Sequence, residues 1–157
     1  MVGYVQAAMT TPEGWDVGSG FELERFLAQP LTARLATSGA DGPRVRPIWY
    51  LFEDHAFWWI TGSWSNLERA LERSAVVELV VDTCDLDTGE VLQVRARGEA
   101  SVEPFDAELA QRWGARYLGS DRGRWGRFAT EVFEDPSSRF VRLAPGWLWA
   151  RDLSWER

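Results

Sequence analysis

The sequence predicts a mainly β domain with short helices (α+β), built as a closed or nearly closed barrel of six antiparallel strands. Three observations support this class. The 157 residues suit one ordinary domain better than two, and 45% of them are hydrophobic, as in globular proteins. Six segments either alternate apolar and polar residues with the period of a strand or are rich in β-branched residues. Closure into a small barrel is the expected way to leave no exposed strand edge.

The first predicted elements are a short helix and three strands. The helix lies within residues 19–30, where Ser19 and Glu22 have the spacing of a capping box and Pro30 ends it. Strands with a period of two follow at 32–38, 44–53 and 56–62. The turn ADGP (40–43) joins the first pair and a tight turn at 53–55 joins the second, so we expect a three-stranded meander.

The rest of the chain alternates helices and strands. A helix is predicted at 65–74, where Ser65 and Glu68 repeat the capping-box spacing. Strands are predicted at 75–83, at 90–103 and at 139–153, the last one interrupted at Pro145 and Gly146. Between them lie a helix at 104–119, with Leu109 and Trp113 on one side, and a loop with a helical turn at 121–138.

The segment 44–62 is apolar on both faces, which is unusual for barrel strands. Val45, Trp49 and Leu51 lie on one face, and Ile48, Tyr50 and Phe52 lie on the other. One face fills the barrel, so the other is expected to be polar unless something covers it. The sequence offers no spare element for this, which predicts that a second copy of the chain, a flat ligand, or both provide the cover.

Residues 1–20 are interpreted as a loosely ordered leader and residues 21–157 as a single domain. The leader has no basic start followed by an apolar core, as a secretory signal would have. No run of about 18 apolar residues occurs, so nothing is expected to span or anchor in a membrane. A cytoplasmic protein is therefore expected.

The composition also excludes several functions. The net charge is -7 and all 17 basic residues are arginines, which argues against nucleic acid as a partner and leaves no lysine to form a Schiff base. The chain has one cysteine, Cys84, and one histidine, His55, so no zinc site and no other metal centre is expected. The position of His55 in a predicted turn argues against haem ligation and against a serine hydrolase triad.

Polar and basic residues gather where the strand at 56–62 meets the following helix. Thr61, Ser63 and Ser65 bring hydroxyl groups to a helix start, where backbone N–H groups attract anions, and Arg44 or Arg46 on the neighbouring strand can lie beside them. Aromatic rings able to stack on a planar group surround this point: Trp49, Tyr50, Trp58, Trp59 and Trp64. Plainer readings stay open: Ser65 as an ordinary N-cap, the arginines as a solvated strand face, and at least one of Trp58 and Trp59 as core or subunit interface.

The stretch LTARLATSGADGPRVRPIWYLFEDHAFWWITGSWSNLER resembles the split-barrel flavin-binding family that includes pyridoxamine phosphate oxidase, and in particular its actinobacterial relatives that use the deazaflavin coenzyme F420. The features that carry the resemblance are Leu35–Thr37, Asp41–Gly42, Pro47–Tyr50, Thr61, Asn66–Leu67 and Val76–Asp82. The match covers about residues 21–103 and, more weakly, the terminal strand to Trp149.

The resemblance implies a homodimeric split barrel of the FMN-binding type, with the ring of FMN or coenzyme F420 between two protomers and its phosphate near the strand-to-helix turn. The cofactor-binding residues it predicts are Arg44, Arg46, Pro47, Ile48, Trp49, Tyr50, Thr61, Gly62, Ser63, Trp64, Ser65, Asn66 and Arg69. Relatives often have a lysine and an arginine just before the NL pair, where this chain has Ser63 and Ser65. Arg46 and Arg69 are then expected to replace those cations.

Two classes of function follow from the resemblance. The first is an oxidoreductase that passes a hydride or electrons between FMN or F420 and a small unsaturated or heteroaromatic substrate, with the chemistry carried by the cofactor and no catalytic residue identified. The second is a non-catalytic protein of the same fold, which binds or stores a flavin or deazaflavin or has lost its ligand.

Overall fold

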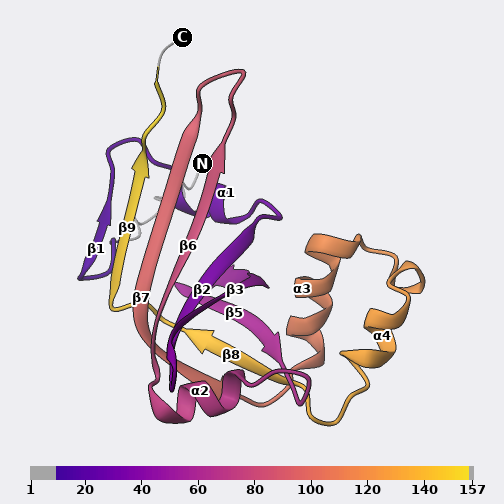
Figure 1. Cartoon of the computed structure of the whole chain (residues 1–157). Coiled ribbons are helices and arrows are strands. Elements are labelled where there is room, and N and C mark those ends of the chain that lie inside the picture. The colour runs from indigo at the N-terminus through magenta and orange to yellow at the C-terminus, as the bar shows by residue number, and fades with distance from the viewer. Residues whose placement is uncertain (1–9, 156–157) are drawn as a thin grey trace, which may run out of the picture.

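The strands form one bent sheet in the order β3-β2-β6-β7-β8-β5-β4, with β9 and then β1 added beside β7 (Figure 1). This computed structural model describes residues 10–155. Its strands are β1 (Trp15–Val17), β2 (Thr32–Gly39), β3 (Gly42–Trp49), β4 (Leu51–Glu53), β5 (Ala56–Thr61), β6 (Val76–Cys84), β7 (Val91–Glu103), β8 (Arg139–Leu143) and β9 (Trp147–Asp152). Its helices are α1 (Leu23–Leu27), α2 (Leu67–Arg73), α3 (Ala107–Leu118), α4 (Arg127–Glu131) and the 3-10 helix η1 (Arg122–Arg124).

The predicted class, mainly β with short helices and antiparallel strands, is confirmed, and the strand count within residues 10–155 differs for clear reasons. The predicted strand 44–53 divides into β3 and β4, and the predicted strand 139–153 divides into β8 and β9 at the expected interruption. The ninth strand, β1, lies in the segment predicted to be a loose leader, where it pairs in parallel with β9. Residues 1–9 of that predicted leader lie outside the described residues.

The long strand β7 joins the two halves of the barrel. Its first half pairs with β9 from Leu92 to Arg97, and its second half pairs with β8 from Ala100 to Glu103. Figure 1 shows β1 and β9 along one side of β7, whereas β5 and β8 run towards α3 on the other side. With thirteen residues, β7 is thus long enough to pair with β9 along its first half and with β8 along its second half.

The chain changes sheets at Tyr50, which separates β3 from β4. Tyr50 is fully buried, its N–H donates to the hydroxyl of Tyr117 at 3.0 Å, and its own hydroxyl donates to the carbonyl of Leu27 at 3.1 Å. Both predicted antiparallel pairings are confirmed, because β3 pairs with β2 and β4 pairs with β5, but the middle strand of the predicted meander is broken at the bend. Because β3 and β5 are not paired with each other, the barrel is split between them.

The hairpin from β4 to β5 confirms the predicted tight turn. Only Asp54 and His55 lie between the paired residues Glu53 and Ala56, and both have positive φ values, 51° and 58°. A two-residue hairpin with positive φ at both positions is the type I′ geometry, whose twist matches that of the strands.

The helices mostly begin later than the sequence predicts. The predicted capping box of Ser19 and Glu22 is absent, because α1 has no side-chain cap and Glu22 pairs with Arg25 at 3.0 Å. Helix α3 starts after Asp106, whose carboxylate accepts the N–H of Leu109 at 2.9 Å, and ends at Gly119 as predicted. Among residues 10–155 the structure contains no helix with the length and apolar character needed to span a bilayer.

Two apolar cores lie on opposite faces of the bent sheet. The larger fills the barrel and includes Tyr50, and it packs against Ile48 and Phe52. The smaller lies between the sheet and α3, where Leu51 and Trp113 are buried. The chain therefore covers part of its own doubly apolar segment with α3, and the expectation that it has no element to do so is wrong.

Candidate functional site

The turn between β5 and α2 projects a tryptophan from the protein surface. Trp64 is 52% exposed, and its ring lies directly against the backbone of Gly62. A Cβ atom added to Gly62 would approach the Trp64 ring to 2.2 Å, so only glycine leaves room for this arrangement. The close contact fixes where the indole stands relative to the turn.

Arg46 reaches the same turn from β3. Its Nη1 lies 3.4 Å from the hydroxyl of Ser65, and that hydroxyl also accepts the N–H of Leu67 at 3.1 Å. Partial burial, with the nearby charge of Arg44, lowers the pKa of Arg46 below its ordinary value. A guanidinium carries five N–H donors, so Arg46 keeps donors for an anionic ligand beside Ser65.

Two further polar groups line the space between β3 and β5 without a protein partner. The hydroxyl of Thr61 and the indole N–H of Trp59 are buried and form no hydrogen bond among the described residues. Buried polar atoms in folded proteins nearly always have a partner, so these two atoms, carried by residues that line the same depression as Arg46, could accept or donate to a polar ligand there.

Three adjoining depressions meet at Trp64, which lines all of them. The Arg46 groove lies where the barrel is split between β3 and β5, and is lined by Arg46, Pro47, Ile48, Trp59, Ile60, Thr61, Trp64, Ser65, Asn66 and Leu67. The aromatic chamber is lined by Thr32, Pro47, Ile48, Trp49, Ile60, Trp64, Trp113, Phe128 and Val132. The Arg69 groove is lined by Gly62, Ser63, Trp64, Ser65, Asn66, Glu68, Arg69, Glu72, Ser137 and Arg139.

Ser63 forms its hydrogen bonds with another residue of the protein, Ser137. Its N–H donates to the hydroxyl of Ser137 at 3.0 Å, and the two serine hydroxyls lie 3.0 Å apart. The carboxylate of Asp135 accepts the single hydroxyl hydrogen of Ser137 at 2.6 Å, so the contact between the serines uses the hydrogen of Ser63. These hydrogen bonds from Ser137 lower the pKa of the Asp135 carboxyl.

Eleven of the thirteen predicted site residues line one or more of these depressions, and two do not. Arg44 is exposed, lies 3.7 Å from Asp41 and lines none of the three. Tyr50 is in the barrel core, where burial raises the pKa of its hydroxyl. Sequence reasoning missed Trp113, Phe128, Ser137 and Arg139, because only the tertiary fold brings the segment 107–139 against β3 and β5.

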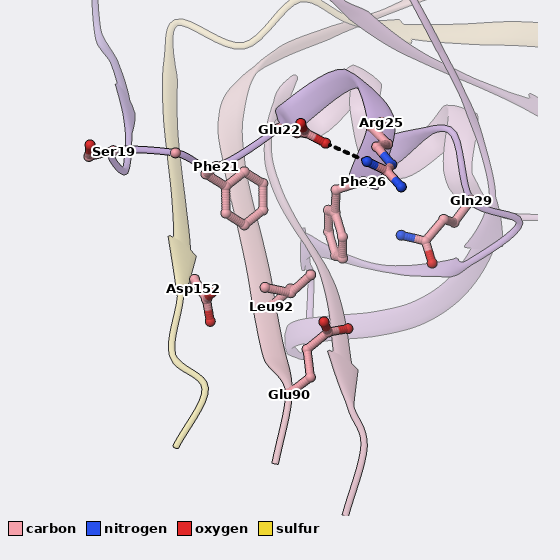
Figure 2. A pocket seen from close by; sticks show the side chains of 10 residues that line it. Ser19, Phe21, Glu22, Arg25, Phe26, Gln29, Glu90, Leu92 and Asp152 are labelled. Carbon is pink, nitrogen blue, oxygen red and sulfur yellow. Dashed lines mark hydrogen bonds and ion pairs between the residues drawn. The ribbon is translucent and has the colours of Figure 1, made fainter. Parts of the chain in front are cut away.

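A separate depression at the other end of the barrel is lined mainly by acidic residues among its charged side chains (Figure 2). Phe21, Phe26 and Leu92 form its apolar part, and the carboxylates of Glu22, Glu90 and Asp152 surround them. Arg25 is already paired with Glu22. Carboxylates repel phosphate, so this depression does not suit a phosphorylated cofactor. No group of three or more His, Cys, Asp or Glu side chains in residues 10–155 is placed to hold a metal ion.

A split antiparallel barrel with an arginine and hydroxyl groups beside a strand-to-helix turn is the architecture of the flavin-binding split-barrel class. The chain belongs to the pyridoxamine 5'-phosphate oxidase family, whose sequence pattern matches residues 21–152. The resemblance inferred from the sequence is therefore confirmed, and the match extends beyond the stretch that first indicated it.

Solved structures share this fold. A conserved hypothetical protein from Mycobacterium tuberculosis is 23% identical with a TM-score of 0.66, and the match covers 91% of this chain and 90% of that one. A protein named F420 reductase is 22% identical with a TM-score of 0.59, covering 84% and 98% of the two chains. A FAD-binding protein from Mycobacterium smegmatis is 18% identical with a TM-score of 0.60, covering 89% and 99%. None of the curated protein sequences compared with this chain matches it.

Proposed function

We propose that the protein is an oxidoreductase that binds FMN or coenzyme F420 in the Arg46 groove. The observation that carries this proposal is the pairing of Arg46 with Ser65, beside the unsatisfied hydroxyl of Thr61, in a groove whose wall includes Trp64. Solved proteins of this fold are named as an F420 reductase and as FAD-binding, which supports a flavin-type cofactor.

The residues of the groove fit the two ends of such a cofactor. Arg46 and Ser65 are the donors for a phosphate. The Arg69 groove adds the guanidinium groups of Arg69 and Arg139, although Glu68 and Glu72 line it as well and balance their charge. These arginines replace the basic residues expected at 63 and 65. Ile48 and Trp64 offer flat apolar surface to a ring.

The protein's part in the reaction is to bind and position. A flavin or deazaflavin, when bound, supplies hydride or electron transfer to a small unsaturated or heteroaromatic substrate. Among the residues that line the Arg46 groove, Arg46 alone is charged and none is Asp, Glu, His or Cys. The groove residues are therefore expected to orient the reactants and to exclude water, without acting as general acids or bases.

The decisive experiment compares Arg46→Ala with Arg44→Ala. Arg46→Ala is expected to weaken the binding of FMN or F420 by about 1.5–3 kcal/mol, because a charged hydrogen bond to phosphate is lost. Arg44→Ala removes the same charge from the same strand face outside the groove and is expected to have a much smaller effect. Calorimetric titration of both cofactors measures this, and equal losses in the two variants would refute the proposed phosphate position.

The second candidate function is a protein that binds or stores the cofactor without turnover, and the lack of an acid or base in the groove favours it. The two functions differ in one measurement. An enzyme reoxidises the bound reduced cofactor faster with an unsaturated acceptor than the free cofactor reacts, whereas a storage protein slows that reaction.

We also propose that two copies of the chain associate through the outer face of β3, β2, β6, β7 and β9. Val45 and Val76 on this face are 69% and 50% exposed. Most charged side chains there are paired within the chain: Arg34 with Asp82 at 2.5 Å, and Glu78 with Arg95 and Arg97 at 2.7 and 2.9 Å. Charges paired in this way are not left alone when the face is buried. Glu99, opposite Val76 in the pairing of β6 with β7, is an exposed charge on this face without an ion-pair partner among the described residues.

A further inference from the structure

The aromatic chamber differs from the grooves beside it in having no charged residue in its lining. Its nine lining residues are apolar or aromatic except for Thr32, and its volume is about 350 Å³. This volume lies at the small end of the range for ligand pockets. The chamber shares Pro47, Ile48, Ile60 and Trp64 with the Arg46 groove, so a molecule held in one lies directly beside a molecule held in the other.

The chamber walls are held in place by rings from α3 and α4. Trp49 stacks on Tyr117 with ring centroids 4.6 Å apart, and on Phe128 with centroids 5.5 Å apart. The indole N–H of Trp113 donates to the carbonyl of Trp49 at 3.0 Å. The ring of Trp49 is therefore stacked on other rings of the protein. These contacts hold the chamber in shape before any ligand binds.

We propose that the aromatic chamber binds an uncharged, planar substrate and excludes a phosphorylated one. The inference deepens the proposed function, because it names the chemical class that would meet the cofactor of the Arg46 groove. A planar molecule gains by contact with Trp113, Phe128 and Trp64. A phosphate in the same place would lose its water and meet no cation, because Arg46 lies in the neighbouring groove and is engaged there by the cofactor.

A matched pair of probes tests the charge preference. Calorimetry on the cofactor-loaded protein compares 2-naphthol with 2-naphthyl phosphate, which have the same ring system. We expect 2-naphthol to bind at least about tenfold more tightly. The same order is expected without cofactor in Arg46→Ala, where the neighbouring cation is gone. Equal affinities, tighter binding of the phosphate, or displacement of 2-naphthol by the cofactor would each overturn the inference.

Substitutions in the wall locate the binding. Val132→Arg places a cation in the chamber and is expected to weaken 2-naphthol and strengthen 2-naphthyl phosphate. Leu86→Arg, on the loop between β6 and β7 where Leu86 is 65% exposed, adds the same charge elsewhere and is the matched control. If Val132→Arg does not fold, Phe128→Ala replaces it, and we expect this variant to bind 2-naphthol several-fold more weakly. An unchanged preference in folded variants would place the probe outside the chamber.

The outcomes separate the two proposals. If FMN or F420 binds in an Arg46-dependent way and 2-naphthol does not bind, the proposed function is supported and the proposed substrate site in the chamber is refuted. If 2-naphthol binds in a way that depends on Val132 and Phe128 and neither cofactor binds, the substrate site is supported and the proposed function is refuted.

Discussion

At the scale of single residues, Trp64 organises the candidate site. It lines both grooves and the chamber, and its position depends on the missing side chain of Gly62. The sequence predicts both residues as cofactor-binding, but the contact between them becomes visible only in three dimensions. A small change at Gly62 is therefore expected to disturb the site more than the fold.

Gly62→Ala tests this dependence. The added Cβ would lie 2.2 Å from the Trp64 ring, and because that ring is half exposed it is expected to swing away rather than strain the core. We expect the free energy of unfolding to change by less than about 1 kcal/mol and cofactor affinity to fall severalfold. Gly146→Ala, where an added Cβ meets nothing within 4 Å, is the control. Full affinity in Gly62→Ala would show that the indole position does not matter for binding.

Glu78 is the residue for which the structure predicts a pH dependence. Burial by itself raises the pKa of its carboxyl, but hydrogen bonds from Arg95 and Arg97 outweigh burial and leave the pKa below its ordinary value of 4.5. A carboxyl with a depressed folded-state pKa stabilises the fold above its unfolded value and loses that contribution as the pH falls through the folded value.

Glu78→Gln is therefore expected to lower the free energy of unfolding at pH 7 by about 1 kcal/mol or less, since both arginines are partly exposed. The difference from the wild type is expected to shrink as the pH falls below 4.5. Urea unfolding at a series of pH values measures it. A difference that stays constant down to pH 3 would mean that the ion pairs do not contribute.

At the scale of elements, α3, η1 and α4 form a unit that shapes the chamber. Trp125 is 2% exposed and its indole N–H donates to the carbonyl of Gly119 at 2.8 Å. Its ring packs over Gly114 on α3, where an added Cβ would meet ring carbons at 2.6 and 2.7 Å. The absence of a side chain at Gly114 thus lets the segment after α3 fold back against the helix.

Gly114→Ala is expected to destabilise the protein, against helix propensity. Alanine is favoured over glycine in a helix by about 1 kcal/mol, but overpacking against a buried ring costs about 1–3 kcal/mol. Urea unfolding is expected to show a net loss of about 1 kcal/mol. The loss should disappear, or become a gain, in a Trp125→Ala background, where the ring is absent. A stabilised single variant would show that Trp125 can move aside.

At the scale of the whole molecule, the two faces of the sheet differ in how they are covered. Helices α3 and α4 lie together on one side of β5 and β8 (Figure 1), where they cover Trp49 and Leu51. The outer face around Val45 and Val76 remains exposed. Within the segment 44–62, from which the dimer was predicted, α3 and α4 cover Trp49 and Leu51, so the expectation of a dimer now rests on Val45 together with Val76.

Val45→Arg tests the proposed dimer. An arginine at this apolar position of a self-associating face would be buried without an ion-pair partner, so we expect the mass measured by light scattering at micromolar concentration to fall from two chains to one. Leu86→Arg adds the same charge outside that face and should leave the mass unchanged. A wild-type protein that is monomeric under these conditions would rule out the dimer.

Local sequence patterns determined much of the fold. Apolar alternation and runs of β-branched residues located the strands from 32 to 152, and the turn residues located the hairpin at Asp54 and His55. The family resemblance, carried by short-range motifs, was confirmed by a match over residues 21–152. These features are encoded locally, because strand alternation and turn conformation depend on neighbouring residues.

The tertiary structure decided what neighbouring residues cannot specify. The bend at Tyr50 depends on hydrogen bonds to Tyr117 and Leu27, which are 67 and 23 residues away. The same is true of the chamber, whose wall residues Trp113 and Phe128 meet Trp49 only after α3 and α4 fold against the sheet. The sequence indicates that Ser63 is available to a ligand, whereas in the structure it is hydrogen-bonded to Ser137, 74 residues later in the chain. Contacts at such separations arise from the packing of the whole chain, which no short pattern records.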